Sequence, residues 1–355
     1  MCAEQSAKKL TRLLPLPTIR DIMQMYKVRA SRRLSQNFLL NEALNHKIVK
    51  SAGKIKQAEV CEVGPGPGNI TRSIIHKGAE RVIVIEKDPQ FLPTLEMLKS
   101  ACPVPFEIIH GDILRYNFEK TFSESKRKPW EDKYPDIHII GNLPFNVATP
   151  LIIRWIRDIS LKQNAWSYGR VRLTLTFQKE VAERMVAPVM TAQRCKLSVM
   201  CQNWCFVDYK FTIPGKAFLP KPDVDVGVVH FKPHINPIIP LPFVLIEKVV
   251  KAMFTGRQKF LNNSLKNLFP ELKQDLAVRM LEESEIHPKT RAMQLSVEEI
   301  GRLCFSYDKI IKEEPSLRKY DHHKTKDDSS WQIKEEEEEH KLELWKRKQI
   351  EDEFY

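Results

Sequence analysis

The sequence has few of the features that mark a membrane protein or a disulfide-stabilised one. Its longest apolar runs, such as residues 238–246, are interrupted by proline and are far shorter than the roughly 20 residues that a membrane-spanning helix needs. The 7 cysteines include no C-x-x-C pair, and the closest two are Cys201 and Cys205. These absences argue against a transmembrane helix, a zinc framework and a full set of disulfides, and they favour a reducing compartment.

The charge is basic and unevenly distributed. The chain has 355 residues, 42% of them hydrophobic, enough for one large domain and a smaller one. Its net charge is +12, and because residues 311–355 hold 10 Lys and Arg against 14 Asp and Glu, residues 1–310 hold 47 against 31, a balance of +16. Such an excess favours a polyanionic partner such as RNA or DNA, although a merely soluble basic protein is the alternative.

The first 34 residues are basic, with apolar residues interspersed and only two acids. This pattern is more typical of an organelle transit peptide than of a secretory signal, which needs a continuous apolar core. We therefore expect residues 1–30 to be a basic N-terminal extension that serves in part as a transit peptide. The alternative is a basic arm that stays on the protein and touches RNA.

Strand-like runs indicate an α/β fold. Short apolar runs alternate with helix-like segments between residues 58 and 142, a spacing that predicts a parallel sheet with crossover helices. Further strands are expected at residues 171–178, 209–214 and 226–231, which makes an open sheet of about seven strands. We assign residues 31–235 to one such Rossmann-like domain.

The pattern changes after a proline-rich link at residues 232–242. Helical periods without a strand-like run predict a small all-α domain over residues 240–312. Residues 313–355 carry a glutamate run and alternating charges, so we expect a tail that is disordered or forms a solvated helix without a core.

The first predicted strand leads into a glycine-rich turn, residues 64–68. Glycine lets the backbone approach a ligand closely and adopt positive φ. In a dinucleotide-binding fingerprint the third glycine comes three residues after the second, but here it comes two residues after. Pro65 and Pro67 also lack the N–H groups that a phosphate would need. The loop is therefore expected to hold a ligand other than a pyrophosphate.

Three carboxylates follow the tips of successive predicted strands. Glu62 precedes the glycines and suits a ligand with an ammonium group, while Glu86 follows Gly64 by 22 residues, where a ribose diol is usually held. Asp112 is placed to accept a hydrogen bond from the exocyclic amine of adenine. Taken singly, each could be a helix cap or a solvated carboxylate. In this order they indicate S-adenosyl-L-methionine, which carries all three groups.

The stretch Asn142, Leu143, Pro144 and Phe145 ends the fourth predicted strand, beside the methyl group of such a cofactor. An adenine amino nitrogen is a poor nucleophile because its lone pair is delocalised into the ring. The side-chain carbonyl of Asn142 and the backbone carbonyl of Leu143 would accept its hydrogens and direct the lone pair. Pro144 fixes the turn, and Phe145 offers a face on which a base stacks. The alternative is a strand-ending turn with Phe145 in the core.

With these motifs the sequence resembles the ribosomal RNA adenine dimethyltransferases, which modify two adjacent adenines near the end of small-subunit rRNA. The resemblance extends from residue 34 to about residue 305. The motifs that carry it are residues 34–41, 62–71, 84–88, 110–114, 141–152, 176–187, 218–229, 254–266 and 291–300. Phe145 departs from the tyrosine common in bacterial members but keeps the stacking face.

The resemblance implies an enzyme that dimethylates the N6 atoms of adenines with S-adenosyl-L-methionine. The residues that it assigns to the cofactor pocket are Gln36, Asn37, Leu39, Glu62, Gly64, Gly66, Glu86, Lys87, Asp112, Ile113 and Asn142. It also implies a basic helix at residues 254–266 whose Arg257, Lys259 and Lys266 contact the RNA backbone. An ordinary solvated helix face is the alternative for these three residues.

The N-terminal extension and the charged tail resemble those of mitochondrial members of the family, which are also described as transcription factors. The resemblance therefore implies a monomer in the mitochondrial matrix that acts on rRNA of the assembling small ribosomal subunit, with the transcription machinery as a second partner.

Two other functions remain as alternatives. One is a non-enzymatic transcription cofactor or nucleic-acid-binding scaffold, which would have no need of Glu86, Asp112 and Asn142. The other is a methyltransferase for one large-subunit adenine that confers antibiotic resistance, against which the helical domain and the N-terminal extension count.

Overall fold

The computed structural model describes residues 16–18, 21, 24–25, 36–256 and 258–322. Most of the predicted N-terminal extension and most of the predicted tail lie outside these residues. Within the described part of the chain, no helix combines the length and the apolar character that crossing a membrane requires.

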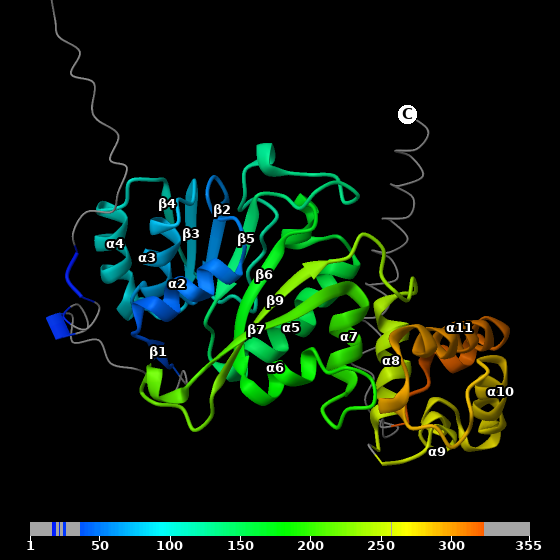
Figure 1. The fold of residues 1–355 in the computed structure, drawn as a ribbon. Helices are drawn as coiled ribbons and strands as arrows, with labels where there is room; N and C mark the ends of the chain where they lie inside the picture. Colours follow the sequence, from blue (N-terminus) through cyan, green and yellow to red (C-terminus); the bar gives the residue numbers. More distant parts are fainter. Residues whose placement is uncertain (1–15, 19–20, 22–23, 26–35, 257, 323–355) are drawn as a thin grey trace, which may run out of the picture.

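Seven strands form one sheet in the spatial order β4–β3–β2–β5–β6–β9–β7 (Figure 1). The first five of these pair in parallel, and β9 is antiparallel to both β6 and β7. The strands are β2 (Glu59–Val63), β3 (Arg81–Glu86), β4 (Phe106–His110), β5 (Ile137–Gly141), β6 (Arg172–Gln178), β7 (Cys205–Ile213) and β9 (Val226–Pro233). The chain runs outward from β2 to β4 and then returns to place β5 on the other side of β2, which creates a topological switch point.

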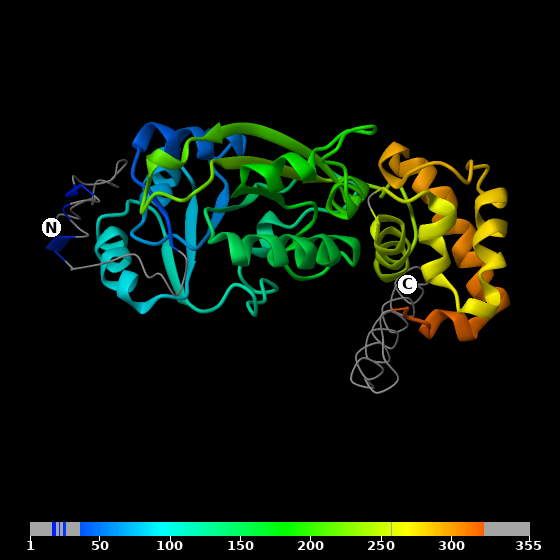
Figure 2. The same ribbon diagram turned by 90° about the horizontal axis from the view of Figure 1, so that it is seen from below.

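Helices cover both faces of the sheet, as a buried parallel sheet requires. Val82 and Val84 of β3 face one hydrophobic cluster, and the alternating Ile83 and Ile85 face the other. The first face carries α2 (Glu42–Ser51), α3 (Asn69–His76) and α4 (Leu92–Ser100), and the second carries α5 (Phe145–Ser160), α6 (Lys179–Met185) and α7 (Lys196–Trp204). Figure 2 shows helices on both sides of the sheet. The predicted α/β class with about seven strands is confirmed.

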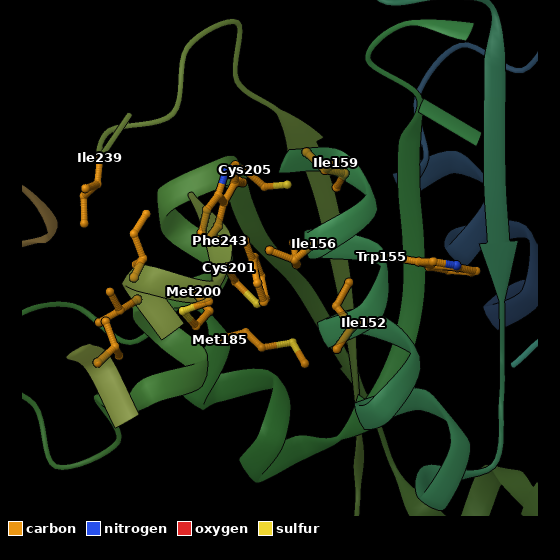
Figure 3. Packing of buried hydrophobic residues seen from close by; sticks show 14 of the residues in the cluster. Ile152, Trp155, Ile156, Ile159, Met185, Met200, Cys201, Cys205, Ile239 and Phe243 are labelled. Atoms are coloured by element: carbon orange, nitrogen blue, oxygen red, sulfur yellow. The ribbon is translucent and has the colours of Figure 1, made fainter. Parts of the chain in front are cut away.

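A helical region follows the sheet and lies beyond its β7 end (Figures 1 and 2). It contains α8 (Phe243–Phe254), α9 (Leu261–Ser264), α10 (Asp275–Glu283) and α11 (Val297–Glu313). Its core is continuous with the second face of the sheet, because Phe243 packs on Trp204 with ring centroids 5.1 Å apart. In Figure 3, Phe243 lies beside Met200 and Cys201 of α7. The predicted helical C-terminal region is confirmed, and the exact domain boundaries stay predictions.

The prediction of one basic helix over residues 254–266 is wrong. Helix α8 ends at Phe254, and Phe260 then forms an isolated antiparallel bridge with Arg291 before α9 begins. Phe260 is extended, with φ −69° and ψ 152°, and the N–H of Leu261 donates to the carbonyl of Thr290 at 2.8 Å. This distant partner satisfies the backbone in place of a helical hydrogen bond, so the helix is interrupted.

A small second sheet was not predicted. It pairs β1 (Phe38–Leu39) with β8 (Phe218–Leu219) in antiparallel register. The pairing brings the segment before the seven-stranded sheet together with the segment before β9. It thereby holds the residues around Phe38 and Leu39 against the carboxyl edge of the sheet.

Replacing Gly141 by alanine should lower the free energy of unfolding by about 1–3 kcal/mol. A Cβ atom there would lie 2.4 Å from Cγ2 and 2.9 Å from the backbone oxygen of Val63 on the neighbouring strand. Urea denaturation followed by circular dichroism measures the change. Gly111→Ala is the matched control, because nothing lies within 4 Å of a Cβ at that position. Equal losses in the two variants would contradict crowding as the cause.

Candidate active site

A cavity of about 380 Å³ lies at the carboxyl edge of the sheet, beside the switch point. Its volume falls in the range of small-molecule sites. The predicted site residues that line it are Gln36, Asn37, Leu39, Glu62, Gly64, Gly66, Glu86, Lys87, Asp112, Ile113, Asn142, Leu143, Pro144 and Phe145. The structure therefore brings together all the residues assigned to the cofactor and to methyl transfer, while their individual roles stay predictions.

The glycine-rich turn is held by its own hydrogen bonds. Gly64, Gly66 and Gly68 have φ values of +69°, +54° and +90°, which favour glycine. Their N–H groups donate within the protein, to Ile85 O at 2.9 Å, Glu86 Oε2 at 2.9 Å and Pro65 O at 3.0 Å respectively. With these donors engaged, the turn is poorly suited to cradle a phosphate, which agrees with the interpretation of its sequence.

Glu86 is the last residue of β3, and its buried carboxylate lies against the glycine-rich turn that follows β2. It is 6% exposed and accepts hydrogen bonds from Gly66 N at 2.9 Å and Asp88 N at 2.8 Å. Burial raises the pKa of its carboxyl, and the backbone N–H groups oppose that shift by favouring the charged form. Each oxygen keeps capacity for a further donor, so the carboxylate can also hold a ligand hydroxyl.

Glu62 is buried more deeply, with 1% of its surface exposed. The hydroxyl of Thr71 donates to its Oε2 at 2.5 Å. Burial raises the pKa of Glu62 to about 8, so without a cation beside it the carboxyl is mostly protonated at pH 7. An ammonium group in the cavity would favour the ionised form.

Asp112 differs from both because it is ionised and partly exposed. Lys87 Nζ donates to its Oδ2 at 2.8 Å, and Leu114 N donates to its Oδ1 at 3.0 Å. The lysine holds the pKa of this carboxyl below its usual range. Ile113, which follows it, is buried at 6% exposure and contributes an apolar wall.

The turn from Asn142 to Pro144 joins the end of β5 to the start of α5. The side chain of Asn142 donates through Nδ2 to the Asn37 carbonyl at 3.3 Å, and its Oδ1 accepts from Thr176 Oγ1 at 2.7 Å. Phe145 is half-buried, lines the cavity and also packs against the hydrophobic cluster on the first face of the sheet. The side chain of Leu143 lies against the glycine turn, where a Cβ on Gly64 would come within 2.7 Å of its Cδ2.

The segment Gln36–Leu39 closes one side of the cavity. Gln36 Nε2 donates to Asp88 Oδ2 at 2.8 Å, and the carbonyl of Leu39 accepts from Asn69 Nδ2 at 2.9 Å and Asn45 Nδ2 at 3.2 Å. These contacts, together with the β1–β8 pairing, tie the segment to four other parts of the chain, namely Asp88, α2, α3 and β8.

Comparisons with known proteins show to which family the chain belongs. The model of the family "Ribosomal RNA adenine dimethylase" matches residues 27–309. The chain belongs to that family. The expected family and the expected enzyme class, an rRNA adenine dimethyltransferase, are thereby confirmed.

Individual relatives agree with the family match. The chain is 51% identical over 310 residues to "Dimethyladenosine transferase 1, mitochondrial" of Homo sapiens, covering 87% of this chain and 90% of that protein. The protein of the same name from Drosophila melanogaster is 44% identical over 328 residues, covering 90% of this chain and 97% of that protein. A crystal structure of a dimethyladenosine transferase from Plasmodium falciparum has a TM-score of 0.61 at 23% identity and covers 76% of this chain and 96% of that chain. That likeness confirms the fold.

Of the predicted RNA-binding residues, Lys259 and Lys266 do not line the cavity. Arg257 is outside the described residues, Lys259 is exposed in the turn after α8, and Lys266 is half-buried in the 3₁₀ helix Leu265–Leu268. A separate hollow of about 360 Å³ lies between α8 and residues 318–322. Its basic lining residues are Lys196, Lys248, Lys251, Arg318, Lys319 and His322.

Sequence reasoning missed several residues of the site. Phe38, Phe91 and Phe218 give it an aromatic wall, in which the rings of Phe38 and Phe91 meet edge to face at 5.4 Å. Thr71 and Thr176 act behind the cavity, on Glu62 and Asn142. Both threonines lie in sequence motifs that carry the family resemblance, so the sequence could have marked them as candidate site residues. Their hydrogen-bond partners become known only from the fold.

The raised pKa of Glu62 predicts a pH dependence of stability. The unfolded carboxyl titrates near 4.5 and the folded one near 8, so between these values the folded state binds more protons. The free energy of unfolding should therefore fall as pH rises through this window, at up to about 1.4 kcal/mol per pH unit from this group. Glu62→Gln, which keeps an acceptor for Thr71, should remove that part of the slope.

Urea denaturation of both proteins at pH 5, 6.5 and 8 measures the difference. Titrating groups remote from Glu62 are common to both proteins and cancel in the comparison, whereas Glu86 interacts electrostatically with Glu62 and adds a smaller difference. Parallel curves for the wild type and the variant would show that Glu62 ionises normally in the folded chain.

Proposed function

We propose that this chain uses S-adenosyl-L-methionine to dimethylate the N6 atoms of two adjacent adenines in a hairpin loop near the 3′ end of mitochondrial small-subunit rRNA. It acts in the mitochondrial matrix, as a monomer, and supports assembly of the small ribosomal subunit. One observation carries the proposal. The Asn142–Phe145 turn lines the same cavity as Glu62, Glu86 and Asp112.

The lining of the cavity fits S-adenosyl-L-methionine. Glu62 would hold the ammonium group, since a buried neutral carboxyl ionises when a cation is placed beside it. Glu86 would hold the ribose hydroxyls, and Asp112 would accept from the adenine amine. The apolar wall of Phe38, Ile113 and their neighbours suits the adenine ring. When bound, the cofactor supplies an electrophilic methyl group.

The chain itself would activate the acceptor by orientation. Asn142 Oδ1 and Leu143 O accept the hydrogens of the adenine amine, so the nitrogen becomes more tetrahedral and its lone pair points away from the ring. Phe145 stacks on the purine and fixes its plane, at a gain of about 1–3 kcal/mol. Pro144 holds the turn. The proton leaves the nitrogen to solvent as the amine becomes substituted.

The RNA would meet the basic surfaces of the helical region. The name of the human relative includes "dimethyladenosine transferase" and "mitochondrial", which supports the substrate class and the compartment. We propose that the RNA phosphates contact Arg257, Lys259 and Lys266. The contribution of these contacts to RNA affinity should fall as the salt concentration rises. Adenines in a tight loop are partly unstacked already, which lowers the cost of placing one in the cavity.

A non-enzymatic transcription scaffold is not favoured. Glu62 and Glu86 are 1% and 6% exposed, and burying such carboxyls costs stability. In a scaffold nothing would offset this loss of stability, whereas in a cofactor site the two carboxyls would bind the ligand.

The direct test incubates the protein with radiolabelled S-adenosyl-L-methionine and an RNA stem-loop that contains two adjacent adenines. Digestion to nucleosides should yield N6,N6-dimethyladenosine. A matched stem-loop with guanosines at those positions is the control, and a large-subunit hairpin tests the alternative substrate. Label only in the large-subunit hairpin, or no label in any RNA, would reject the proposal.

Asn142→Ala should lower kcat by about 10²–10³-fold with little change in RNA affinity, because it removes a hydrogen bond that matters in the transition state. Glu86→Ala should instead weaken cofactor binding first, because it removes the proposed ribose acceptor. Single-turnover methylation and calorimetric cofactor titration separate the two effects. A variant at position 142 that methylates at the wild-type rate would refute the role of the amide.

Phe145→Leu should raise KM for the RNA and lower kcat, because leucine offers no aromatic face to the base. Phe145→Tyr keeps the ring and should stay close to the wild type. Steady-state kinetics on the stem-loop compare the two variants. Equal damage from both changes would indicate that the ring acts by packing in the protein interior.

A further inference from the structure

The side-chain amide of Asn142 is held at both ends. Its Nδ2 donates to the backbone carbonyl of Asn37 at 3.3 Å, and its Oδ1 accepts from the hydroxyl of Thr176 at 2.7 Å. Thr176 lies on β6, the strand next to β5, and is 1% exposed. Three segments far apart in the sequence thus meet on one amide group.

The two partners act differently on this amide. A backbone carbonyl can only accept, so Asn37 requires that Nδ2 faces it and that Oδ1 faces away. A hydroxyl can donate or accept, so Thr176 then donates to Oδ1. Since the bond to Thr176 is the shorter of the two, it contributes most of the restraint on rotation of the amide.

We propose that Thr176 is a positioning residue that fixes the Asn142 amide so that its oxygen accepts a hydrogen of the adenine amine. The inference rests on the proposed function and deepens it. A carbonyl oxygen has two acceptor sites, so Thr176 can occupy one and leave the other for the amine. Because Thr176 is buried, water cannot readily replace its hydroxyl as a donor.

Orientation matters here because the amide works through geometry. If the amide rotates, Nδ2 approaches the hydrogens of the amine, and two donors then face each other. Even a displacement of about 1 Å can reduce the rate of an oriented reaction by about 10²-fold. Loss of the Thr176 hydroxyl should therefore affect the rate of methyl transfer more than the binding of either substrate.

The test replaces Thr176 by valine, which has nearly the same shape but no hydroxyl. Thr176→Val should lower kcat by about tenfold, the effect expected for one lost hydrogen bond. KM for the RNA and Kd for the cofactor should stay within about twofold of the wild type, because Thr176 itself does not line the cavity. Thr176→Ser keeps the donor and should restore most of kcat.

Thr174→Val is the matched control. Thr174 lies two residues earlier on the same strand and face and is also 1% exposed. Its hydroxyl is bonded to His230 Nδ1 at 2.9 Å, away from the cavity residues. This variant loses a comparable buried hydrogen bond but should keep the wild-type kcat.

A second readout needs no activity. The side-chain amide resonances of Asn142, assigned by their loss in Asn142→Ala, should shift in Thr176→Val and stay in place in Thr174→Val. The inference is overturned if Thr176→Val keeps the wild-type kcat, if Thr174→Val loses as much, if serine fails to rescue, or if the resonances do not move. A wild-type protein without methyl transfer would reject the proposed function instead, and the resonances would still decide whether the hydroxyl holds the amide.

Discussion

The architecture of the site depends on one buried carboxylate, that of Glu86. It accepts from Gly66 N at 2.9 Å and from Asp88 N at 2.8 Å, so it joins the loop after β2 to the loop after β3. A buried carboxylate is stable only when such donors surround it, and glycine at position 66 lets the backbone adopt the φ of +54° at which its N–H reaches the carboxylate. This hydrogen bond preorganises one wall of the cavity within the protein itself.

The sheet topology then decides which residues share this wall. Strands β2 and β5 are parallel neighbours, with Val63 opposite Gly141 in register, so the glycine turn and Asn142 leave the sheet side by side. A Cβ on Gly64 would clash with Leu143, which shows how closely the two turns pack. The order reversal around β2 therefore places the proposed electrophile site and the proposed acceptor site next to each other, although their motifs are about 75 residues apart.

Much of this could be predicted because the signals are local. Period-two apolar runs located the strands, and parallel pairing implies that Glu62, Glu86, Asp112 and Asn142 meet at one edge. What escaped prediction depends on long-range partners. The β1–β8 pair has two residues per strand, too short for a periodic pattern, and the helix break near Phe260 arises from a bridge to Arg291. Thr176 alternates with core residues on β6, so its sequence context predicts packing and conceals its bond to the amide.

Two buried carboxyls distinguish the carboxyl edge of the sheet from the apolar middle of β3. Most of β3 is apolar on both faces, with Val82, Ile83, Val84 and Ile85 all buried, and this part stabilises the sheet. At the edge where the parallel strands end, two acidic side chains, Glu62 and Glu86, are buried and line the cavity. Their burial is unfavourable for stability. Because burial holds Glu62 mostly neutral in the absence of a cation, a cationic ligand would change the charge of the site as it binds. The backbone of the site is thus held by hydrogen bonds within the protein, while the protonation of Glu62 would respond to a cationic ligand, a combination that suits the proposed cofactor.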